Sequence, residues 1–157
     1  MAPGEPGGSR LTLRSATEAN SFLDAFAGTM RALEEVLGEE TSYLAKGRVR
    51  EALSREARKS ELAGAYLRGL ECAKANAVAL KRLCPEALPG IRTAQERLRE
   101  VVERNQAVIA TARAVSEGLV KSVADEVSAR ARPAGYGAGP PSGQRASAAP
   151  LAVSRRM

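Results

Sequence analysis

Apolar side chains recur every three or four residues along three stretches of the chain, which is the period of an amphipathic helix. In the first stretch, about residues 15–45, Ser15 and Glu18 have the spacing of a capping box, and Gly47 follows as a C-cap glycine. Its apolar stripe consists of Phe22, Leu23, Phe26, Met30, Leu33, Leu37 and Leu44. The stripe is interrupted by Glu40. This pattern predicts a long first helix with a coiled-coil-like seam.

Two further helices are predicted from the same period. The second, about residues 48–84, has a patchier stripe, because Glu56, Lys59 and Ser60 fall where apolar residues would be expected. The third, about residues 91–130, is regular apart from Asn105 in its seam. The connection at 85–90 is short, which makes the flanking helices antiparallel neighbours. We therefore expect an all-α fold, an elongated antiparallel bundle of three long, coiled-coil-like helices.

The two ends of the chain differ from its centre in composition. Residues 1–14 are rich in Gly and Pro, and residues 133–157 are rich in Pro, Gly, Ser and Ala, which cannot bury a core. We expect a disordered N-terminal segment at 1–14, a helical domain at 15–132, and a disordered basic tail at 133–157. Neither a signal-peptide pattern at the N-terminus nor a run of 18 apolar residues occurs, which predicts a cytoplasmic protein without stable membrane insertion.

The formal net charge of +6 comes mainly from the tail. Residues 21–127 contain 17 basic and 16 acidic side chains, a difference of +1, whereas no acidic residue follows Glu126. The tail has one aromatic residue, Tyr136, so repeated base stacking has no support. We therefore expect no nucleic-acid partner, although binding through the arginine-bearing tail stays open as an alternative.

The residues needed for catalysis or metal binding are scarce. The chain has no His, which removes the commonest general base and metal ligand. Cys72 and Cys84, about 18 Å apart on one predicted helix, can form neither an intrachain disulfide nor a zinc site, and indicate buried or half-buried thiols. Glu35 and Glu39 share a helix face, which makes them a candidate divalent-cation site, but a solvated acidic face is the favoured interpretation. We expect no enzymatic activity, no cofactor and no metal.

The end of the third predicted helix carries an apolar band that is wider than one seam needs. Its members are Val115, Leu119, Val120, Val123 and Val127. If the neighbouring helices end earlier, the band is exposed and can accept an amphipathic helix from another protein. Packing of the band within the bundle or in a homodimer is the alternative.

Several segments together have a distinctive pattern: residues 32–41, 46–48, 97–105, 112–118, 136–137, 149–151 and 154–156. These segments resemble FlgN-type flagellar export chaperones, and the closing ones, from residue 136 onward, resemble alphaproteobacterial members of that family. The resemblance covers roughly residues 20–157.

This resemblance implies a chaperone that binds hook-associated (hook–filament junction) proteins through their helical termini and delivers them to the flagellar type III export gate. It assigns client binding to the C-terminal helical part, here the band from Val115 to Val127, and export-gate docking to the C-terminal region, here Tyr136. No nucleotide or metal is implied. The alternative is a coiled-coil scaffold or signalling adaptor that acts through self-association.

Overall fold

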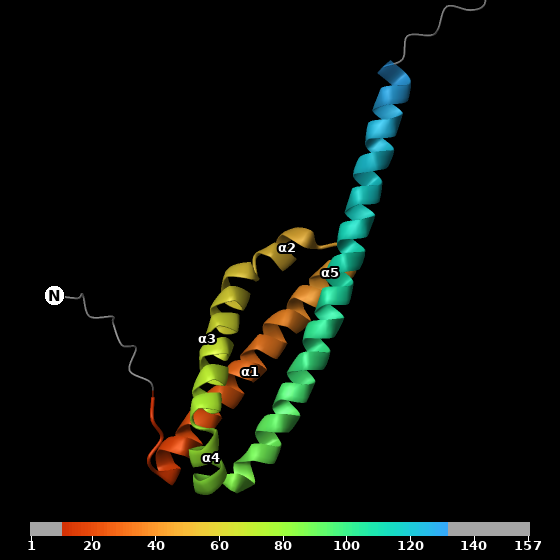
Figure 1. The fold of residues 1–157 in the computed structure, drawn as a ribbon. Helices are drawn as coiled ribbons and strands as arrows, with labels where there is room; N and C mark the ends of the chain where they lie inside the picture. Colours follow the sequence, from red (N-terminus) through yellow and green to blue (C-terminus); the bar gives the residue numbers. More distant parts are fainter. Residues whose placement is uncertain (1–10, 132–157) are drawn as a thin grey trace, which may run out of the picture. The chain divides into compact units, whose positions relative to one another are not determined.

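All regular structure in the described residues is helical, which confirms the expected all-α class. The computed structural model describes residues 11–131. Its elements are α1 (Ala16–Ala45), α2 (Val49–Leu53), α3 (Glu56–Ala75), α4 (Ala77–Leu83), the 3₁₀ turn η1 (Pro85–Ala87) and α5 (Leu88–Ala131) (Figure 1). The expectation of three long helices is wrong for the second one, because the stretch 48–84 forms α2, α3 and α4 instead.

The chain divides into two units, Met1–Leu119 and Val120–Met157, and α5 contributes residues to both. The expected tail at 133–157 and most of the expected N-terminal segment lie outside the described residues. Between residues 11 and 131 no helix is long and apolar enough to cross a membrane.

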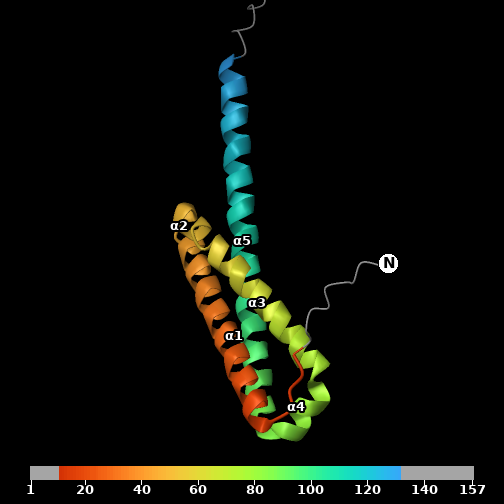
Figure 2. The ribbon, with the colours of Figure 1, turned by 90° about the vertical axis from the view of Figure 1, so that its left-hand side faces the viewer.

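Helices α1, α3 and the first part of α5 pack together within the first unit. In Figures 1 and 2, α3 runs back along α1, and α5 then runs in the same direction as α1. One cluster of buried side chains comprises Phe26, Met30, Leu33, Leu37, Leu62, Ala94 and Leu98. A second cluster comprises Leu13, Ala19, Leu23, Leu80 and Cys84. The predicted seam of the first helix is therefore confirmed as the centre of the core.

Both ends of α1 are capped as residue types there predict, with one difference. The Ser15 hydroxyl accepts a hydrogen bond from the Glu18 amide at 3.2 Å, but the Glu18 carboxylate accepts from the Arg14 amide rather than from Ser15. At the other end Gly47 adopts φ 70°, which glycine tolerates best. The amides of Gly47 and Arg48 then bond the carbonyls of Leu44 and Tyr43, the pattern of a Schellman motif.

Helices α3 and α4 are separated at Asn76. The buried side-chain amide of Asn76 forms hydrogen bonds with the segment that precedes α1. The Asn76 Oδ1 atom accepts from the Leu13 amide at 3.0 Å, and Nδ2 donates to the Leu11 carbonyl at 2.8 Å. Leu13 itself is buried in the second cluster. Residues 11–14 thus belong to the packed part of the structure, whereas we expected the whole segment 1–14 to lie outside it.

The break between α2 and α3 is tied to the end of α1. The Ser54 hydroxyl donates to the Glu51 carbonyl at 2.6 Å, and Arg55 pairs with Glu39 of α1 at 3.0 Å. With α2 set apart from α3 in this way, Leu53 at the end of α2 is exposed.

A buried polar network joins α1, α3 and α5. Glu40 is only 6% exposed and Asn105 only 4%. The Asn105 amide donates to Glu40 Oε2 at 2.8 Å and to the Thr41 hydroxyl at 3.1 Å, and Lys59 Nζ pairs with Glu40 Oε1 at 2.8 Å. Burial lowers the pKa of Lys59, but its hydrogen bonds to Glu40 and Glu56 outweigh that effect, so its pKa is raised. Glu40, Lys59 and Asn105, which interrupt the apolar stripes of the three predicted helices, therefore lie together. Each satisfies the hydrogen-bonding needs of another.

The two cysteines are free thiols, as expected. Cys72 is half-buried on α3, and Cys84 is fully buried after α4. Burial raises the pKa of the Cys84 thiol, because a thiolate would lose its hydration there. Cys84 is therefore an unreactive core residue in this fold.

Candidate protein-binding groove

The five residues of the predicted apolar band are all exposed, with exposed fractions between 57% and 70%. Val115 and Leu119 belong to the first unit, and Val120, Val123 and Val127 belong to the second. Each is therefore left uncovered by the other described residues. Tyr136, the residue expected to dock at an export gate, lies outside the described residues.

Within the first unit, Val115 and Leu119 line one wall of a groove of about 680 Å³. The opposite wall comes from the end of α1, the turn at Gly47 and the start of α2, and includes Leu44 and Val49. We call this hollow the α2–α5 groove. It exists because the Gly47 turn ends α1 and starts α2 within a few residues, which places Leu44 and Val49 together opposite α5.

The lining of the α2–α5 groove consists mainly of Ala, Val and Leu side chains, and its hydroxyl groups are already hydrogen-bonded. Thr111 Oγ1 donates to the Ala107 carbonyl at 3.0 Å, and Ser116 Oγ donates to the Ala112 carbonyl at 2.9 Å. Arg104 is the one charged residue of the lining. A surface of this kind suits the apolar face of a helix and supplies no nucleophile or general base.

Sequence reasoning found one wall of this groove and missed the other. The α5 wall follows from helix periodicity, but Leu44 and Val49 read as members of two separate core stripes. The signal that could have linked them was Gly47, since a left-handed turn there brings the flanking apolar residues to one side of the chain.

The carboxylates of the described residues are engaged in ion pairs or dispersed. Residues 11–131 contain no group of three or more His, Cys, Asp or Glu residues that could hold a metal ion. Of the pair Glu35 and Glu39, Glu39 forms the ion pair with Arg55.

Comparison of the chain with protein-family models, with curated proteins and with solved structures gives no significant match.

Proposed function

We propose that this protein is a FlgN-type export chaperone that binds hook-associated proteins in the cytoplasm through their helical termini. The observation that carries the proposal is the α2–α5 groove, in which Val115 and Leu119 stand uncovered opposite Leu44 and Val49. The proposal includes the elongated, coiled-coil-like body and a tail that brings Tyr136 to the export gate. It involves neither catalysis nor a cofactor.

The physical chemistry of the groove supports reversible client binding. A client terminus that folds into an amphipathic helix buries its apolar face against the groove, but it loses conformational entropy as it folds. The net affinity is then moderate, which suits a chaperone that must release its client. Val120, Val123 and Val127 present further exposed apolar area in the second unit for the same purpose.

Replacing Leu119 with Asp tests the groove directly. Because Leu119 is exposed, the substitution should leave the helix content measured by circular dichroism nearly unchanged, while the charge in an apolar contact should abolish client binding. Binding is measured by fluorescence anisotropy with labelled terminal segments of hook-associated proteins. The matched control is Ala114→Asp, which adds the same charge at an exposed α5 position outside the groove lining. Equal binding by both variants, or by neither, would contradict the assignment.

The second candidate is a coiled-coil scaffold, and the exposed valines of the second unit favour it. Val120, Val123 and Val127 recur at intervals of three and four residues and are at least 60% exposed, as an unpaired helix face would be. Sedimentation of the purified chain separates the two functions. A dimer that persists on dilution and shows no affinity for the client termini would favour the scaffold.

A further inference from the structure

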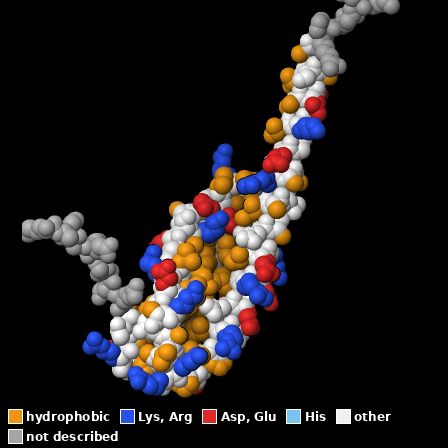
Figure 3. Space-filling view, in the orientation of Figure 1, with side chains coloured by type: hydrophobic (Ala, Val, Ile, Leu, Met, Phe, Trp, Pro, Cys, Tyr) orange, Lys and Arg blue, Asp and Glu red, His pale blue; other side chains and the backbone are white. Residues whose placement is uncertain are grey.

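A second groove lies on the first unit, between α3 and α4 on one side and α5 on the other. It consists of two hollows of about 400 Å³ and 270 Å³, which adjoin each other because both are lined by Arg92 and Gln95. Leu23 and Phe26 of α1 line its depth. Figure 3 shows hydrophobic side chains gathered between α3 and α5, with Lys and Arg side chains at the edges. We call this hollow the α3–α5 groove.

The floor of the α3–α5 groove is apolar and firmly packed. The Phe26 ring stacks between Phe22, at 6.0 Å between centroids, and Tyr66 of α3, at 5.6 Å. A Cβ atom at Gly69 would lie only 2.5 Å from Phe26 Cδ2, so the ring fits beneath α3 because residue 69 has no side chain. The apolar floor is therefore formed in the free protein, which lowers the ordering cost of binding.

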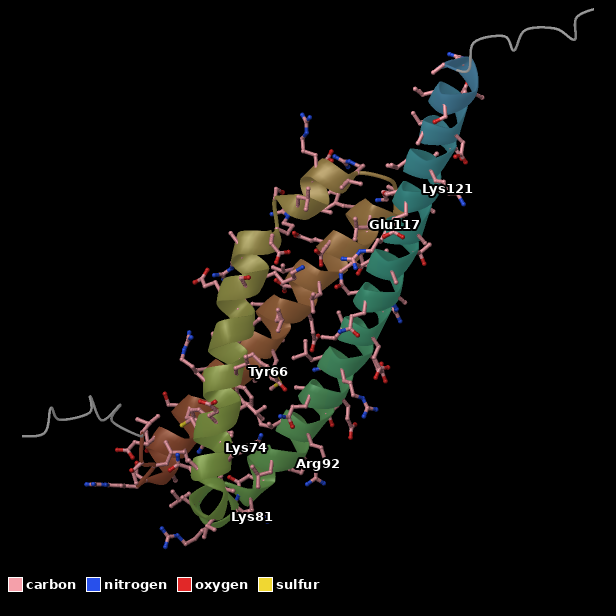
Figure 4. All side chains as sticks on the ribbon, turned by 45° about the horizontal axis from the view of Figure 1, so that its top comes forward. Tyr66, Lys74, Lys81, Arg92, Glu117 and Lys121 are labelled. Atoms are coloured by element: carbon pink, nitrogen blue, oxygen red, sulfur yellow. The ribbon has the colours of Figure 1, made fainter. Side chains whose placement is uncertain are left out.

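The rim of the groove is basic. Lys74 of α3, Lys81 of α4 and Arg92 of α5 line it, and Figure 4 places these labelled residues around the space between α3, α4 and α5. All three are exposed, and none forms an ion pair with a carboxylate of residues 11–131. The lining contains a single acidic residue, Glu96.

Basic side chains of residues 11–131 differ in whether a carboxylate of the same residues neutralises them. Four basic side chains at the starts of α2 and α3 each pair with a carboxylate at 3.0 Å or less. They are Arg48, Arg55, Arg58 and Lys59. The basic side chains that border the α3–α5 groove at Lys74, Lys81 and Arg92 lack such partners within the described chain. Their field is thus available to an acidic ligand that carries an apolar face.

We propose that the α3–α5 groove binds an acidic amphipathic helix of a partner protein. The helix would lay its apolar face on Phe26 and Tyr66, and its flanking carboxylates would meet Lys74, Lys81 and Arg92. On α5 the lining extends from Leu88 to Val102, so at 1.5 Å per residue the α3–α5 groove is roughly 21 Å long. A groove of this length accommodates about 14–18 residues of helix. This inference goes beyond the chaperone proposal, because it concerns a different surface and different residues.

Charge also decides against two other occupants. Residues 132–157 contain four arginines and no acidic residue, so the chain's own tail would place like charges against the basic rim. A second copy that presented the same groove would oppose one basic rim to another. Like charges placed together disfavour both arrangements, whereas an acidic helix gains from the rim.

The experiment uses the full-length chain and a designed, fluorescently labelled 18-residue helix with a Leu and Ala stripe flanked by Glu. A second peptide has the same stripe flanked by Lys. Fluorescence anisotropy should show that the acidic peptide binds and the basic one does not. The variant Lys74→Glu/Arg92→Glu should weaken binding of the acidic peptide roughly tenfold or more and should acquire binding of the basic peptide.

The control variant is Arg50→Glu/Arg113→Glu, which changes the net charge equally at exposed positions outside the groove. It should alter the affinity by less than about twofold, because exposed charges beyond a Debye length are screened. Leu119→Asp should also leave this peptide bound, so failure of this inference and failure of the chaperone proposal are distinguishable. If circular dichroism shows that the double variant is unfolded, Lys74→Gln/Arg92→Gln replaces it.

Several results would overturn the inference. Equal affinity of the Glu and Lys peptides for the unaltered chain would remove the role of the rim. A tenfold rise in peptide affinity on deletion of residues 132–157 would identify the chain's own tail as the occupant. A dimer that the double variant dissolves would identify a second copy, and binding to anionic lipid vesicles in place of the peptide would be incompatible with a basic groove specific for protein.

Discussion

Gly69 shows how a single missing side chain positions the ring on which a groove is built. A methyl group at this residue would meet Phe26 Cδ2 at 2.5 Å and Cε2 at 2.8 Å, and Phe26 is buried and stacks with Phe22 and Tyr66. The buried ring would have to shift to admit the methyl group. Glycine therefore persists inside α3 in spite of the unfavourable helix propensity of about 1 kcal/mol relative to alanine.

We predict that Gly69→Ala lowers the free energy of unfolding by about 1–3 kcal/mol, because overpacking at Phe26 exceeds the gain in helix propensity. The control is Gly28→Ala in α1, where an added Cβ meets no atom within 4 Å. That variant should gain roughly 1 kcal/mol. Urea denaturation followed by circular dichroism measures both, and a gain at both positions would show that Phe26 can yield.

The sequence alone does not separate the glycines inside the predicted helices. Gly64, Gly69 and Gly118 all read as small residues that permit close approach or bending. Only Gly69 faces a ring, while an added Cβ at Gly118 meets nothing and one at Gly64 meets the mobile end of Arg68. The distinction depends on Phe26, which lies 43 residues earlier in the chain, and local patterns carry no information about such a contact.

At the scale of the elements, three helices are joined by the polar network of Glu40, Lys59 and Asn105. We predict that Glu40→Leu lowers the free energy of unfolding by about 1–3 kcal/mol, because it removes an acceptor from the buried Asn105 amide and from Lys59. The triple variant Glu40→Leu/Lys59→Met/Asn105→Leu should recover stability to within about 1 kcal/mol of the original chain or exceed it.

Equilibrium unfolding in urea compares the single and triple variants with the unaltered chain. A triple variant no more stable than Glu40→Leu alone would mean that the site cannot be repacked with apolar side chains. In that case the network would contribute more than the satisfaction of its own polar groups.

The first and third helices could be predicted within a few residues, but the second could not. The cap signals at Ser15 and Gly47 fix the ends of α1, and the apolar period of the third stretch marks the extent of α5. The breaks in the second stretch depend on the contact of Arg55 with Glu39 and of Asn76 with Leu13, both with chain that is distant in sequence. Glu40, Lys59 and Asn105 are also distant from one another in sequence. In the sequence they therefore look like three unrelated polar interruptions of three apolar stripes.

Over the whole molecule, stability is distributed unevenly along α5. Residues 94, 98 and 105 are buried, whereas all side chains from residue 113 to residue 131 are exposed. A helical segment of about this length without packing is marginal in water. The end of α5 should therefore open locally far more often than the core.

We predict that the amides of residues 120–131 exchange with deuterium at least roughly a hundredfold faster than those of residues 94–105. Hydrogen exchange followed by mass spectrometry on the full-length chain measures both segments in one sample, so the core serves as the internal control. Comparable protection of the two segments would show that residues 120–131 are covered in solution, as self-association would require.

One wall of the α2–α5 groove could be predicted from the sequence, while the α3–α5 groove could not. The apolar band of residues 115–127 could be predicted because its members recur at short intervals within one helix, which is a local pattern. The basic rim combines Lys74, Lys81 and Arg92 from three elements, and each of these residues reads in isolation as part of a solvated helix face.

The separation of 65 residues between Glu40 and Asn105 has a consequence for the chain as it is synthesised. At a synthesis rate of about 5–20 residues per second, Asn105 is made roughly 3–13 s after Glu40. During this time the polar network of α1 lacks its partner on α5. The elements made during this interval that contact α1 in the finished fold include α2, α3 and α4. These helices therefore cover α1 first, and the part of α5 that carries Asn105 completes the core afterwards.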